Sequence, residues 1–535
     1  MPIFVGSNSD DSRIRSNRVG FAVSTANPGS ASEGDVYFNS SDGGLRAYDG
    51  SGWSVVGAGG GTFSGIASGT LANGQTVIIQ SDGTIAGIVT TGFTETVGSK
   101  AVFESAETYT GDMAYDSSND RIVIIYQDAG DSNKGKAVVG TVSGTSITFG
   151  TPVTFTSSRT FATNMGCAFD SGNNKVVIAY RDRDGSDHGY GIVGTVSGTS
   201  ISFGSATKFS ASSTSIVKVV YDSNAERNVI VFQDAGDGNY GKTIVATVSG
   251  TSISYSSEGN QTFKSAAVSQ MDATFDSSNN KVVIAYKASS AGKAIVGTVV
   301  TSNDTMTFGS EAEFYSSSIE WTKAEFDSTN NKVIVVYSDA SLYGDAIVGT
   351  VSGTSISFGS ATKINGSAQT QHLGLAYDSN AEKVVVTYQH SAGGDDGELR
   401  VGTVSGTSIT FGSAIDFDGG SVRNTFAMFD STNNKVVIAY GDQGNSTYGT
   451  AVVFQNASVS TNLTSSNFLG FSDAAYSDGQ TATIQIAGAV DDAQSGLTIG
   501  SLHYVQNDGT LSTTAGNPSV EAGTALSATK IKVKK

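Results

Sequence analysis

The sequence repeats itself at intervals of 51 to 54 residues, and this period constrains the fold more than any other feature. The stretch IVGTVSGTSISFGSATK occurs at 192–208 and again, with all seventeen residues identical, at 347–363. A second marker, an aromatic residue followed by Asp-Ser, recurs seven times at intervals of 54, 52, 54, 51, 51 and 52 residues. A regular period of this length is typical of β-propellers and solenoids.

One repeat unit, taken over 165–209, divides into four short strands. The first two are MGCAFD and KVVIAYRD, separated by SGNNK, whose Gly and Asn residues suit a tight turn. The polar loop RDGSDHGYG leads to the strands GIVGTV and ISFGSATKF, which are joined by the turn SGTS. Four antiparallel strands per unit predict a propeller blade, because a solenoid coil is usually shorter. No long segment has a 3.6-residue apolar period, so we predict an all-β chain with almost no helix.

The ends of the repeat region predict that the ring of blades closes. The seventh unit supplies FAMFD, KVVIAY and GTAVVFQ but no fourth strand, whereas GSKAVFESA at 98–106 resembles a fourth strand that precedes the first unit. Pairing of the spare strand with unit seven would remove two exposed strand edges. We therefore predict a seven-bladed β-propeller over 97–457, with the N-terminal strand closing the last blade, flanked by small β-rich N- and C-terminal modules.

The aspartate of each marker has a structural explanation. It precedes a turn of the DSSNN type, in which an Asp carboxylate commonly accepts backbone N–H bonds. A metal site would need further ligands at a fixed spacing, and the turns lack them. We expect this turn role for Asp116, Asp170, Asp222, Asp276, Asp327, Asp378 and Asp430.

The loops divide into a monotonous set and a variable set. The loops after the first and third strands are nearly constant, as in DSSND and SGTS, whereas those after the second and fourth strands differ from unit to unit. Function concentrates on variable loops held by a rigid frame, so the variable face is the expected ligand or receptor face. Its candidate contacts are Arg159, His188, Tyr190, Tyr240, Glu320, Trp321, Tyr343, His372, His390 and Tyr448, and for any single one the favoured alternative is a merely solvated loop residue.

One of these loops is also a candidate cation site. DRDGSD offers three carboxylates around a glycine, Asp182, Asp184 and Asp187, and oxygen ligands are those that Ca²⁺ prefers. The alternative is an ordinary acidic loop, since no EF-hand spacing is present. No other cofactor is expected. The four histidines are scattered and no nucleophile elbow, zinc-binding or nucleotide-binding motif occurs, so we predict that the chain is not an enzyme.

Charge and composition exclude several classes of protein. With 31 basic and 49 acidic residues the net charge is −18, which should repel phosphate backbones, so no nucleic-acid partner is expected. No apolar run approaches the roughly 20 residues that span a bilayer. The single cysteine, Cys167, lies in a strand and is expected to be a buried structural thiol.

The N-terminal segment combines two signals. It lacks the charged and apolar regions of a secretory signal, which fits a surface-type protein assembled in the host cytoplasm and released by lysis. The stretch GDVYFNSSDGGLRAYDGSGW, at 34–53, predicts a hairpin and a following strand. It also resembles a motif of tailed-phage fibre and appendage proteins, carried by Asp35, Tyr37, Asn39, Leu45, Tyr48, Gly50 and Trp53.

The C-terminal segment resembles the same class of protein. GLTIGSLHYVQNDGTLSTT and AGTALSATKIKVK are similar to terminal domains of tail-fibre-like proteins, particularly those of marine phages and cyanophages. The expected domains are therefore a virion-attachment hairpin module at 1–60, a β-rich linker segment at 61–96, the propeller at 97–457 and a fibre-type β module at 458–535.

These resemblances imply a virion surface protein. The leading hypothesis is a non-enzymatic tail fibre or spike whose propeller attaches to a host cell-surface glycan or protein, while the N-terminal region binds other virion proteins. A head fibre or capsid-decorating protein, a polysaccharide-degrading tail spike and, more remotely, a bacterial adhesin remain alternatives. Because fibre modules commonly assemble three-fold, the resemblance also implies a homotrimer on the phage particle.

Overall fold

The computed structural model of the chain describes residues 22–24, 26–32, 35–39, 44–48, 50–56 and 61–534. The chain divides into two compact parts, which we call the repeat domain (Phe93–Ser458) and the terminal domain (Met1–Gly92 with Val459–Lys535). The expectation of an all-β chain is confirmed: helical segments in the described residues are 3-10 turns of three residues, η1 (Ala129–Asp131), η2 (Ala162–Asn164), η3 (Ser391–Gly393) and η4 (Gln443–Asn445). No helix in this described part is long and apolar enough to cross a membrane.

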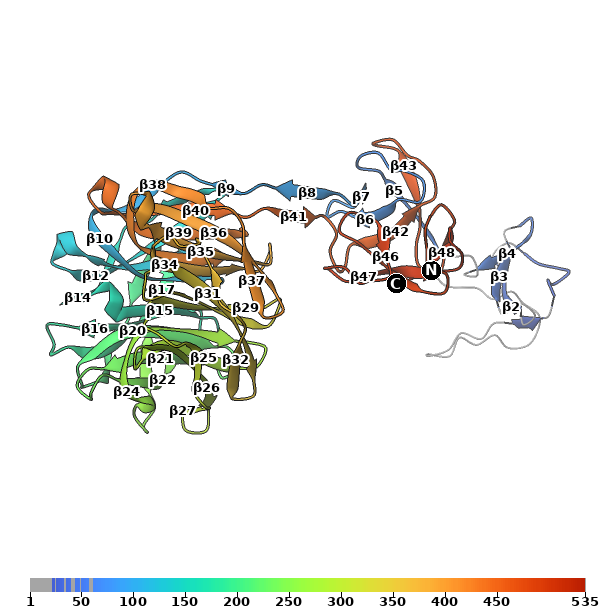
Figure 1. Ribbon diagram of the computed structural model, residues 1–535. Helices are drawn as coiled ribbons and strands as arrows, with labels where there is room; N and C mark the ends of the chain where they lie inside the picture. Colours follow the sequence, from blue (N-terminus) through green and yellow to red (C-terminus); the bar gives the residue numbers. More distant parts are fainter. Residues whose placement is uncertain are drawn as a thin grey trace. The chain divides into compact units, whose positions relative to one another are not determined.

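The repeat domain consists of antiparallel sheets that follow one another along the chain (Figure 1). There are seven such four-stranded units, one for each marker aspartate, and shared long strands join some of them into larger sheets. In each sheet the first strand ends at the marker, the second and third strands pair in order, and a fourth strand in two pieces pairs with the third. Sheets 1 to 3 contain β11 (Arg121–Asp128), β12 (Lys134–Ser143), β13 (Ser146–Phe149), β14 (Val153–Arg159), β15 (Met165–Asp170), β16 (Lys175–Asp182), β17 (His188–Ser197), β18 (Ser200–Phe203), β19 (Thr207–Ser210), β20 (Thr214–Asp222), β21 (Arg227–Asp234), β22 (Tyr240–Ser249) and β23 (Ser252–Tyr255).

The later sheets repeat this order. Sheets 4 to 7 contain β25 (Lys281–Ala288), β26 (Ala291–Val300), β27 (Thr305–Phe308), β28 (Ala312–Tyr315), β29 (Glu320–Asp327), β30 (Lys332–Ser338), β31 (Gly344–Ser352), β32 (Ser355–Phe358), β33 (Thr362–Lys363), β34 (Thr370–Asp378), β35 (Lys383–His390), β36 (Asp396–Ser405), β37 (Ser408–Phe411), β39 (Lys435–Asp442) and β40 (Tyr448–Gln455). Three long strands, β10 (Ala101–Asp116), β24 (Gln261–Asp276) and β38 (Ile415–Asp430), each pass from the fourth position of one sheet to the first position of the next.

Strand β10 links the first sheet to the last. Its second half pairs with β11 of sheet 1, whereas its first half pairs with β40 of sheet 7, with Ala101 opposite Ala451 and Val102 opposite Thr450. The short β9 (Thr96–Val97) pairs with the same strand opposite Phe454 and Gln455. The pairing expected between the spare segment at 98–106 and the last repeat is therefore present.

Aromatic contacts join each sheet to the next. A phenylalanine of the fourth strand packs on an aromatic ring of the second strand in the following sheet, with ring centroids 5.2–5.4 Å apart. The pairs are Phe103–Tyr126, Phe155–Tyr180, Phe209–Phe232, Phe263–Tyr286, Phe314–Tyr337 and Phe417–Tyr440, and Ile364 packs near Tyr388 in the remaining sheet. The Phe103–Tyr126 pair joins sheet 7 to sheet 1.

The marker aspartates hold the turns between the first and second strands. In the first turn, Oδ1 of Asp116 accepts the backbone N–H groups of Ser118 and Asn119, both at 3.0 Å. In the last, Oδ1 of Asp430 accepts those of Thr432 and Asn433 at 3.1 and 2.9 Å. The other five aspartates accept backbone bonds from their own turns in the same way.

The terminal domain is built from both ends of the chain. One sheet has the order β5 (Thr62–Ile66), β43 (Thr481–Gln485), β42 (Phe468–Ser472), β6 (Thr76–Ile79) and β7 (Ile85–Gly87). A second sheet consists of β44 (Val490–Asp491), β48 (Ile531–Val533), β47 (Val520–Ala525), β45 (Leu502–Val505) and β46 (Leu511–Ser512). The chain passes between the two domains through β8 (Thr90–Phe93) and β41 (Ser458–Thr461), which pair with each other.

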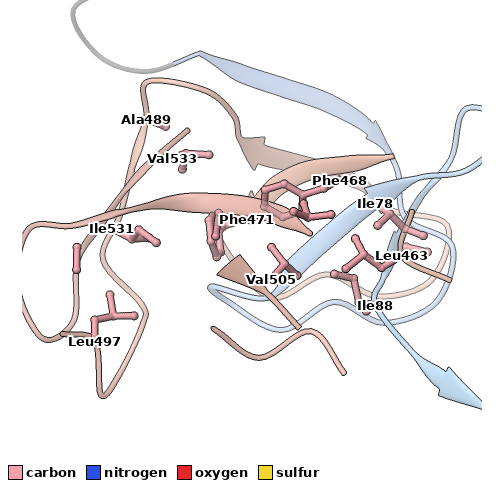
Figure 2. Close-up of a cluster of buried hydrophobic side chains, with 14 residues drawn as sticks. Ile78, Ile88, Leu463, Phe468, Phe471, Ala489, Leu497, Val505, Ile531 and Val533 are labelled. Atoms are coloured by element: carbon pink, nitrogen blue, oxygen red, sulfur yellow. The ribbon is translucent and has the colours of Figure 1, made fainter. Parts of the chain in front are cut away.

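One hydrophobic cluster holds these two sheets together. Ile78 and Ile88, from the segment before the repeats, are buried with Phe468, Phe471 and Val505 from the segment after them (Figure 2). This differs from the separate linker at 61–96 and C-terminal module at 458–535 that we expected. The physical reason is that strands of the two segments alternate in one sheet and bury their apolar side chains in shared clusters.

A small four-stranded sheet lies near the N-terminus, with the order β1 (Ala22–Ser24), β2 (Val36–Asn39), β3 (Gly44–Tyr48) and β4 (Trp53–Val56). The predicted hairpin is present, because β2 and β3 pair antiparallel and β4 pairs with β3. Two motif residues form its main aromatic contact: the rings of Tyr37 and Trp53 lie edge to face, with centroids 4.8 Å apart. The expectation that residues 1–20 lack a secretory signal falls outside the described residues.

Replacement of Phe103 tests whether the β10–β40 pairing stabilises the repeat domain. Phe103 is 6% exposed, whereas its neighbour Val102 is 47% exposed on the other face of the same strand. We expect F103A to lower the free energy of unfolding of the repeat domain by about 3–4 kcal/mol, because a buried ring is lost, and V102A to change it by about 0.5 kcal/mol or less. Denaturant unfolding of the full chain, followed by tyrosine fluorescence, measures both. Equal stability of the two variants would contradict a stabilising role for this pairing.

Candidate functional site

The first strands of the seven sheets surround a common cavity. Residues from all seven strands line a space of about 510 Å³, which we call the turn-side cavity because it lies toward the marker turns. A second space of about 360 Å³, the loop-side pocket, lies at the other end of the same strands. The two share Lys218, Lys323 and Phe426, so these three side chains separate them.

A bulge recurs in the first strands where they border the loop-side pocket. The pairing register shifts at this point in sheets 1 and 3 to 7. The residue six positions before the marker has a left-handed backbone in five of them: Ile216 (φ 46°), Gln270 (50°), Trp321 (46°), His372 (50°) and Asn424 (51°). Such a φ is a real outlier for a β-branched or bulky residue, and bulges commonly redirect side chains at functional sites. Here the bulge places all five residues in the lining of the loop-side pocket.

The aromatic part of this pocket comes from two neighbouring sheets. The rings of Trp321 and His372 have centroids 5.3 Å apart and are tilted by 54°. The backbone N–H of Trp321 donates to Oε1 of Gln270 at 2.9 Å, and the hydroxyl of Thr425 donates to the carbonyl of His372. The two rings are thus held on fixed backbone by polar side chains from the adjoining sheets.

The floor of the loop-side pocket carries two ammonium groups over one aromatic ring. Nζ of Lys323 is 3.7 Å from the centroid of Phe426, and Nζ of Lys218 is 5.6 Å from it. Both distances fall within the range of cation–π attraction. The closest carboxylate oxygen to either ammonium, among the described ion pairs, is Oδ1 of Asp272 at 3.9 Å from Lys218.

Carboxylates occupy the turn-side cavity below this floor. Asp112 accepts the backbone N–H of Cys167 at 3.2 Å, and Asp272 accepts that of Ala324 at 3.0 Å. Glu325, two residues beyond Lys323, accepts the N–H of Phe326 at 3.0 Å. The three carboxylates therefore line the turn-side cavity alone, whereas Lys218 and Lys323 line both spaces.

Burial and the neighbouring charges shift several pKa values in the two spaces. Burial, and then repulsion by Lys218, lowers the pKa of Lys323 to about 8. For Lys218, burial opposes the charge, but attraction by Asp112 and Asp272 outweighs it and raises the pKa. Burial raises the pKa of Glu325 to about 7 and lowers that of His372 to about 4. At neutral pH the floor of the loop-side pocket is therefore cationic, while His372 is a neutral ring.

Two of the ten candidate contact residues, Trp321 and His372, line the loop-side pocket. Glu320 lies beside it: one carboxylate oxygen pairs with Nζ of Lys287 at 2.8 Å, and the other accepts from the side-chain amide of Gln270. Glu320 therefore orients Gln270, which in turn holds the backbone of Trp321.

The other candidates lie outside this pocket. Nε of Arg159 pairs with Asp184 at 2.8 Å, Nδ1 of His390 is 2.8 Å from Glu398, and the ring of Tyr343 lies 5.5 Å from the ammonium of Lys363. His188, Tyr190, Tyr240 and Tyr448 belong to third strands rather than to loops, because β17, β22 and β40 begin earlier than expected. The expected polar loops are correspondingly shorter.

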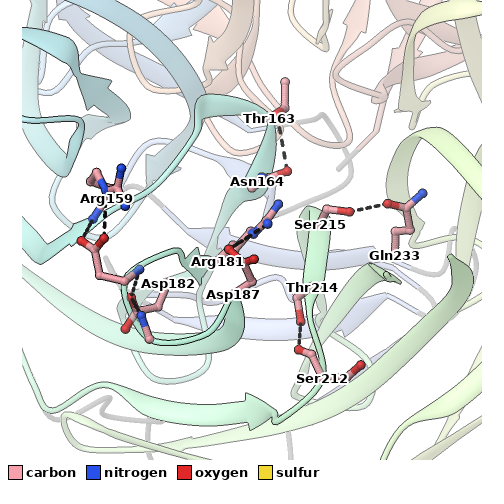
Figure 3. Close-up of polar contacts among 12 residues, drawn as sticks. Arg159, Thr163, Asn164, Arg181, Asp182, Asp187, Ser212, Thr214, Ser215 and Gln233 are labelled. Atoms are coloured by element: carbon pink, nitrogen blue, oxygen red, sulfur yellow. Dashed lines mark hydrogen bonds and ion pairs between the residues drawn. The ribbon is translucent and has the colours of Figure 1, made fainter. Parts of the chain in front are cut away.

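The three carboxylates of the candidate cation site each bind a different group of the protein (Figure 3). Asp184 binds the backbone and side chain of Arg159, and Asp187 pairs with Arg181 at 2.7 Å. Asp182 accepts the backbone N–H groups of Asp184 and Gly185. Within the described part of the chain, no three acidic, His or Cys side chains gather as a metal site would require. The expectation of a Ca²⁺ site is corrected accordingly, since arginines neutralise two of the three carboxylates.

Sequence reasoning missed the charged residues of the channel. Four positions before each marker the repeats carry, in order, Asp112, Gly166, Lys218, Asp272, Lys323, Gly374 and Phe426. The signal was available, because two lysines and two aspartates stand at this one position of strands whose other residues are mostly apolar.

Comparisons with known proteins give little sequence similarity. A scan against protein-family models found no match, and a search of curated proteins found none either. The chain is similar to a solved structure titled NanB plus Optactamide, with 12% identity, a TM-score of 0.41 and coverage of 66% of this chain and 70% of that one. It is also similar to the periplasmic gluconolactonase PpgL of Pseudomonas aeruginosa (10% identity, TM-score 0.45, covering 68% and 98%) and to a protein of unknown function from Dyadobacter fermentans (10%, 0.39, 69% and 99%). At such low identity the function has to be argued from the site itself.

A substitution at Glu325 tests the electrostatics of the channel. The pKa of the Glu325 carboxyl is about 7 in the folded chain, so the folded chain binds the proton of this carboxyl more tightly than the unfolded chain does. Protonated Glu325 makes its whole contribution to the free energy of unfolding below about pH 4.3, which is the pKa of a glutamate in the unfolded chain. This contribution is lost as the pH rises through 7. We expect E325Q to be more stable than the wild type at pH 8, by up to about 3 kcal/mol, and similar to it at pH 4.5.

Denaturant unfolding at the two pH values measures the effect, with the exposed Glu258 as control: E258Q should track the wild type at both. A constant difference between E325Q and the wild type across this range would show that Glu325 does not titrate there. Asp112 and Asp272 stay in place in the variant, as do Lys218 and Lys323, so the change isolates one carboxyl group.

Proposed function

We propose that the chain is a non-enzymatic appendage protein of a tailed phage, a tail fibre or spike, and that its repeat domain attaches the particle to the host surface. The fold proposed for this domain is a closed seven-bladed β-propeller. The β10–β40 pairing supports closure, and so does the cavity to which all seven first strands contribute. The similarity of 34–53 and of the C-terminal segment to phage fibre modules supports the location.

One observation carries the attachment function: a pocket with an aromatic wall lies at the loop end of the first strands, on the face where the repeats differ. Pockets for small ligands are mostly apolar and contain a few fixed polar groups. Trp321 and His372 supply the aromatic surface, and Gln270 and Asn424 supply amides. The opposite face carries the repeated Asp-capped turns, which suit a scaffold rather than recognition.

A polysaccharide-degrading spike is the competing function. Glycoside hydrolysis usually needs two carboxyl groups flanking the bond. Among the described residues that line the loop-side pocket there is no Asp or Glu, whereas Asp112, Asp272 and Glu325 lie in the turn-side cavity. This distribution favours binding over cleavage on the variable face.

The binding experiment uses the purified full chain and a panel of bacterial envelope polysaccharides. We expect retention of at least one polysaccharide on immobilised protein, with no release of oligosaccharides after prolonged incubation. W321A should weaken retention about tenfold or more, because a buried aromatic contact is lost. Y240A, on the same face but outside the pocket, should leave it unchanged. Release of oligosaccharides would overturn the non-enzymatic assignment, and no retention across the panel would overturn glycan attachment.

The proposed assembly is a homotrimer on the virion. Fibre modules commonly assemble three-fold, and both ends of the chain resemble them. Native mass spectrometry of the full chain should give three times the chain mass of 54.7 kDa. A stable monomer would contradict the trimer and favour a head fibre or capsid-decorating protein that binds singly, and immunogold labelling of virions would then locate it on the head rather than the tail.

A further inference from the structure

The floor of the loop-side pocket contains ammonium groups without hydrogen-bond acceptors. Among the described residues, neither Lys218 nor Lys323 donates a side-chain hydrogen bond. Nζ of Lys218 lies 3.9 Å from Oδ1 of Asp272, and within the described part of the chain Lys323 forms no ion pair within 4.0 Å. Other lysines of the repeat domain differ: Lys242, for example, contacts two carboxylates at 2.7 Å. A buried or half-buried ammonium normally binds an acceptor, because its desolvation is otherwise uncompensated. An anion in the pocket would supply that acceptor.

The walls of the pocket favour an anion as well. No carboxylate belongs to the lining in the described part of the chain, although the chain as a whole carries a net charge of −18. The hydroxyls of Thr110 and Thr322, at 1% and 5% exposure, also line the pocket and have no hydrogen-bond partner among the described residues. Unsatisfied buried hydroxyls call for an explanation, and a polar ligand provides one.

The aromatic residues set the shape of a suitable ligand. Trp321 and His372 present adjoining rings, and both have left-handed backbone angles that the bulges maintain. Backbone strain of this kind, about 1–3 kcal/mol per residue, clusters at ligand-binding sites. A flat or saturated six-membered ring can lie against such a surface while its charged substituent points to the floor.

We infer that the loop-side pocket binds a carboxylate on a six-membered ring, with Lys218 and Lys323 contacting the carboxylate and Trp321 the ring. On a cell surface the ligand is an acidic sugar such as a uronic acid residue. That last identification rests on the proposed attachment function, whereas carboxylate binding by the two lysines does not. The pocket volume, about 360 Å³, suits one such residue.

Isothermal titration calorimetry with the full chain tests the inference. The probes are glucuronic acid, glucose as the uncharged sugar of the same shape, and cyclohexanecarboxylate as the charged ring without hydroxyls. We expect glucuronic acid to bind about tenfold or more tightly than glucose, because charge-assisted hydrogen bonds are lost with the neutral sugar. Weaker binding of cyclohexanecarboxylate than of glucuronic acid would assign the site to sugar acids; equal binding would assign it to ring carboxylates in general and overturn the acidic-sugar part.

Lysine variants locate the contact. K323M and K218M keep the length of the side chain but remove its charge, so each should weaken glucuronic acid binding about tenfold and abolish the preference over glucose. K175M, at the start of β16 on the opposite face, is the matched control and should bind like the wild type. Unfolding midpoints check that each variant is folded. A third variant, W321F, retains an aromatic ring and tests the pocket should K323M fail to fold.

The outcomes separate this inference from the proposed function. Equal binding of glucuronic acid and glucose, or full binding by folded K218M and K323M, overturns carboxylate recognition even if polysaccharides are retained elsewhere on the chain. Glucuronic acid binding that requires both lysines, together with no retention of any polysaccharide, keeps the carboxylate site and overturns glycan attachment.

Discussion

The aromatic contact between successive sheets is the interaction on which the repeat domain depends. Each fourth-strand phenylalanine lies over a glycine of the third strand in its own sheet and against a ring of the next sheet. The close approach leaves no room for a larger residue, since a Cβ on Gly449 would lie 2.4 Å from the ring of Phe103. Aromatic pairs contribute about 0.5–1.5 kcal/mol each beyond their buried area. Because the contact runs from one sheet to the next, it fixes their order as well as their stability.

The connection between the first and the last sheet depends on the same interaction. Phe103 stands before the first repeat in the chain, but it fills the fourth-strand position of sheet 7 and packs on Tyr126 of sheet 1. Without the first half of β10, which carries Phe103, strand β40 would keep an exposed edge and the ring of Tyr126 would lose its aromatic partner. A chain of stacked sheets is thereby tied at its two ends by contacts between residues more than 300 positions apart, such as Val102 and Thr450.

Much of this fold was accessible from the sequence because the repeats amplify weak local signals. The strands MGCAFD and KVVIAYRD have the bounds expected for them, Met165–Asp170 and Lys175–Asp182. The fourth strand differs, since an interruption at 204–206 divides it into β18 and β19. The third strand begins three residues earlier than expected because it continues to pair with β16 as far as His188. The partnership of 61–92 with 459–535 was not accessible. Those segments carry no period, and their contacts join residues such as Ile78 and Phe468, nearly 400 positions apart.

The lining of the channel shows how sheets of repeated sequence can contain a site whose residues differ from repeat to repeat. Outward-facing positions of a first strand pack against the second strand of a neighbouring sheet and have to repeat, whereas the position four residues before the marker faces the channel and is free to vary. Lysine, aspartate, glycine and phenylalanine all occur there, whereas the next position is Met, Cys, Val, Ala or Leu in every repeat. Two lysines and three carboxylates at the channel cannot be read as packing residues. The lysines line both spaces, whereas Asp112, Asp272 and Glu325 line the turn-side cavity alone, so an anion entering from the variable face meets no carboxylate in the described lining of the loop-side pocket. The first strands, which lie side by side around the cavity, therefore also supply the floor of the loop-side pocket and its positive charge.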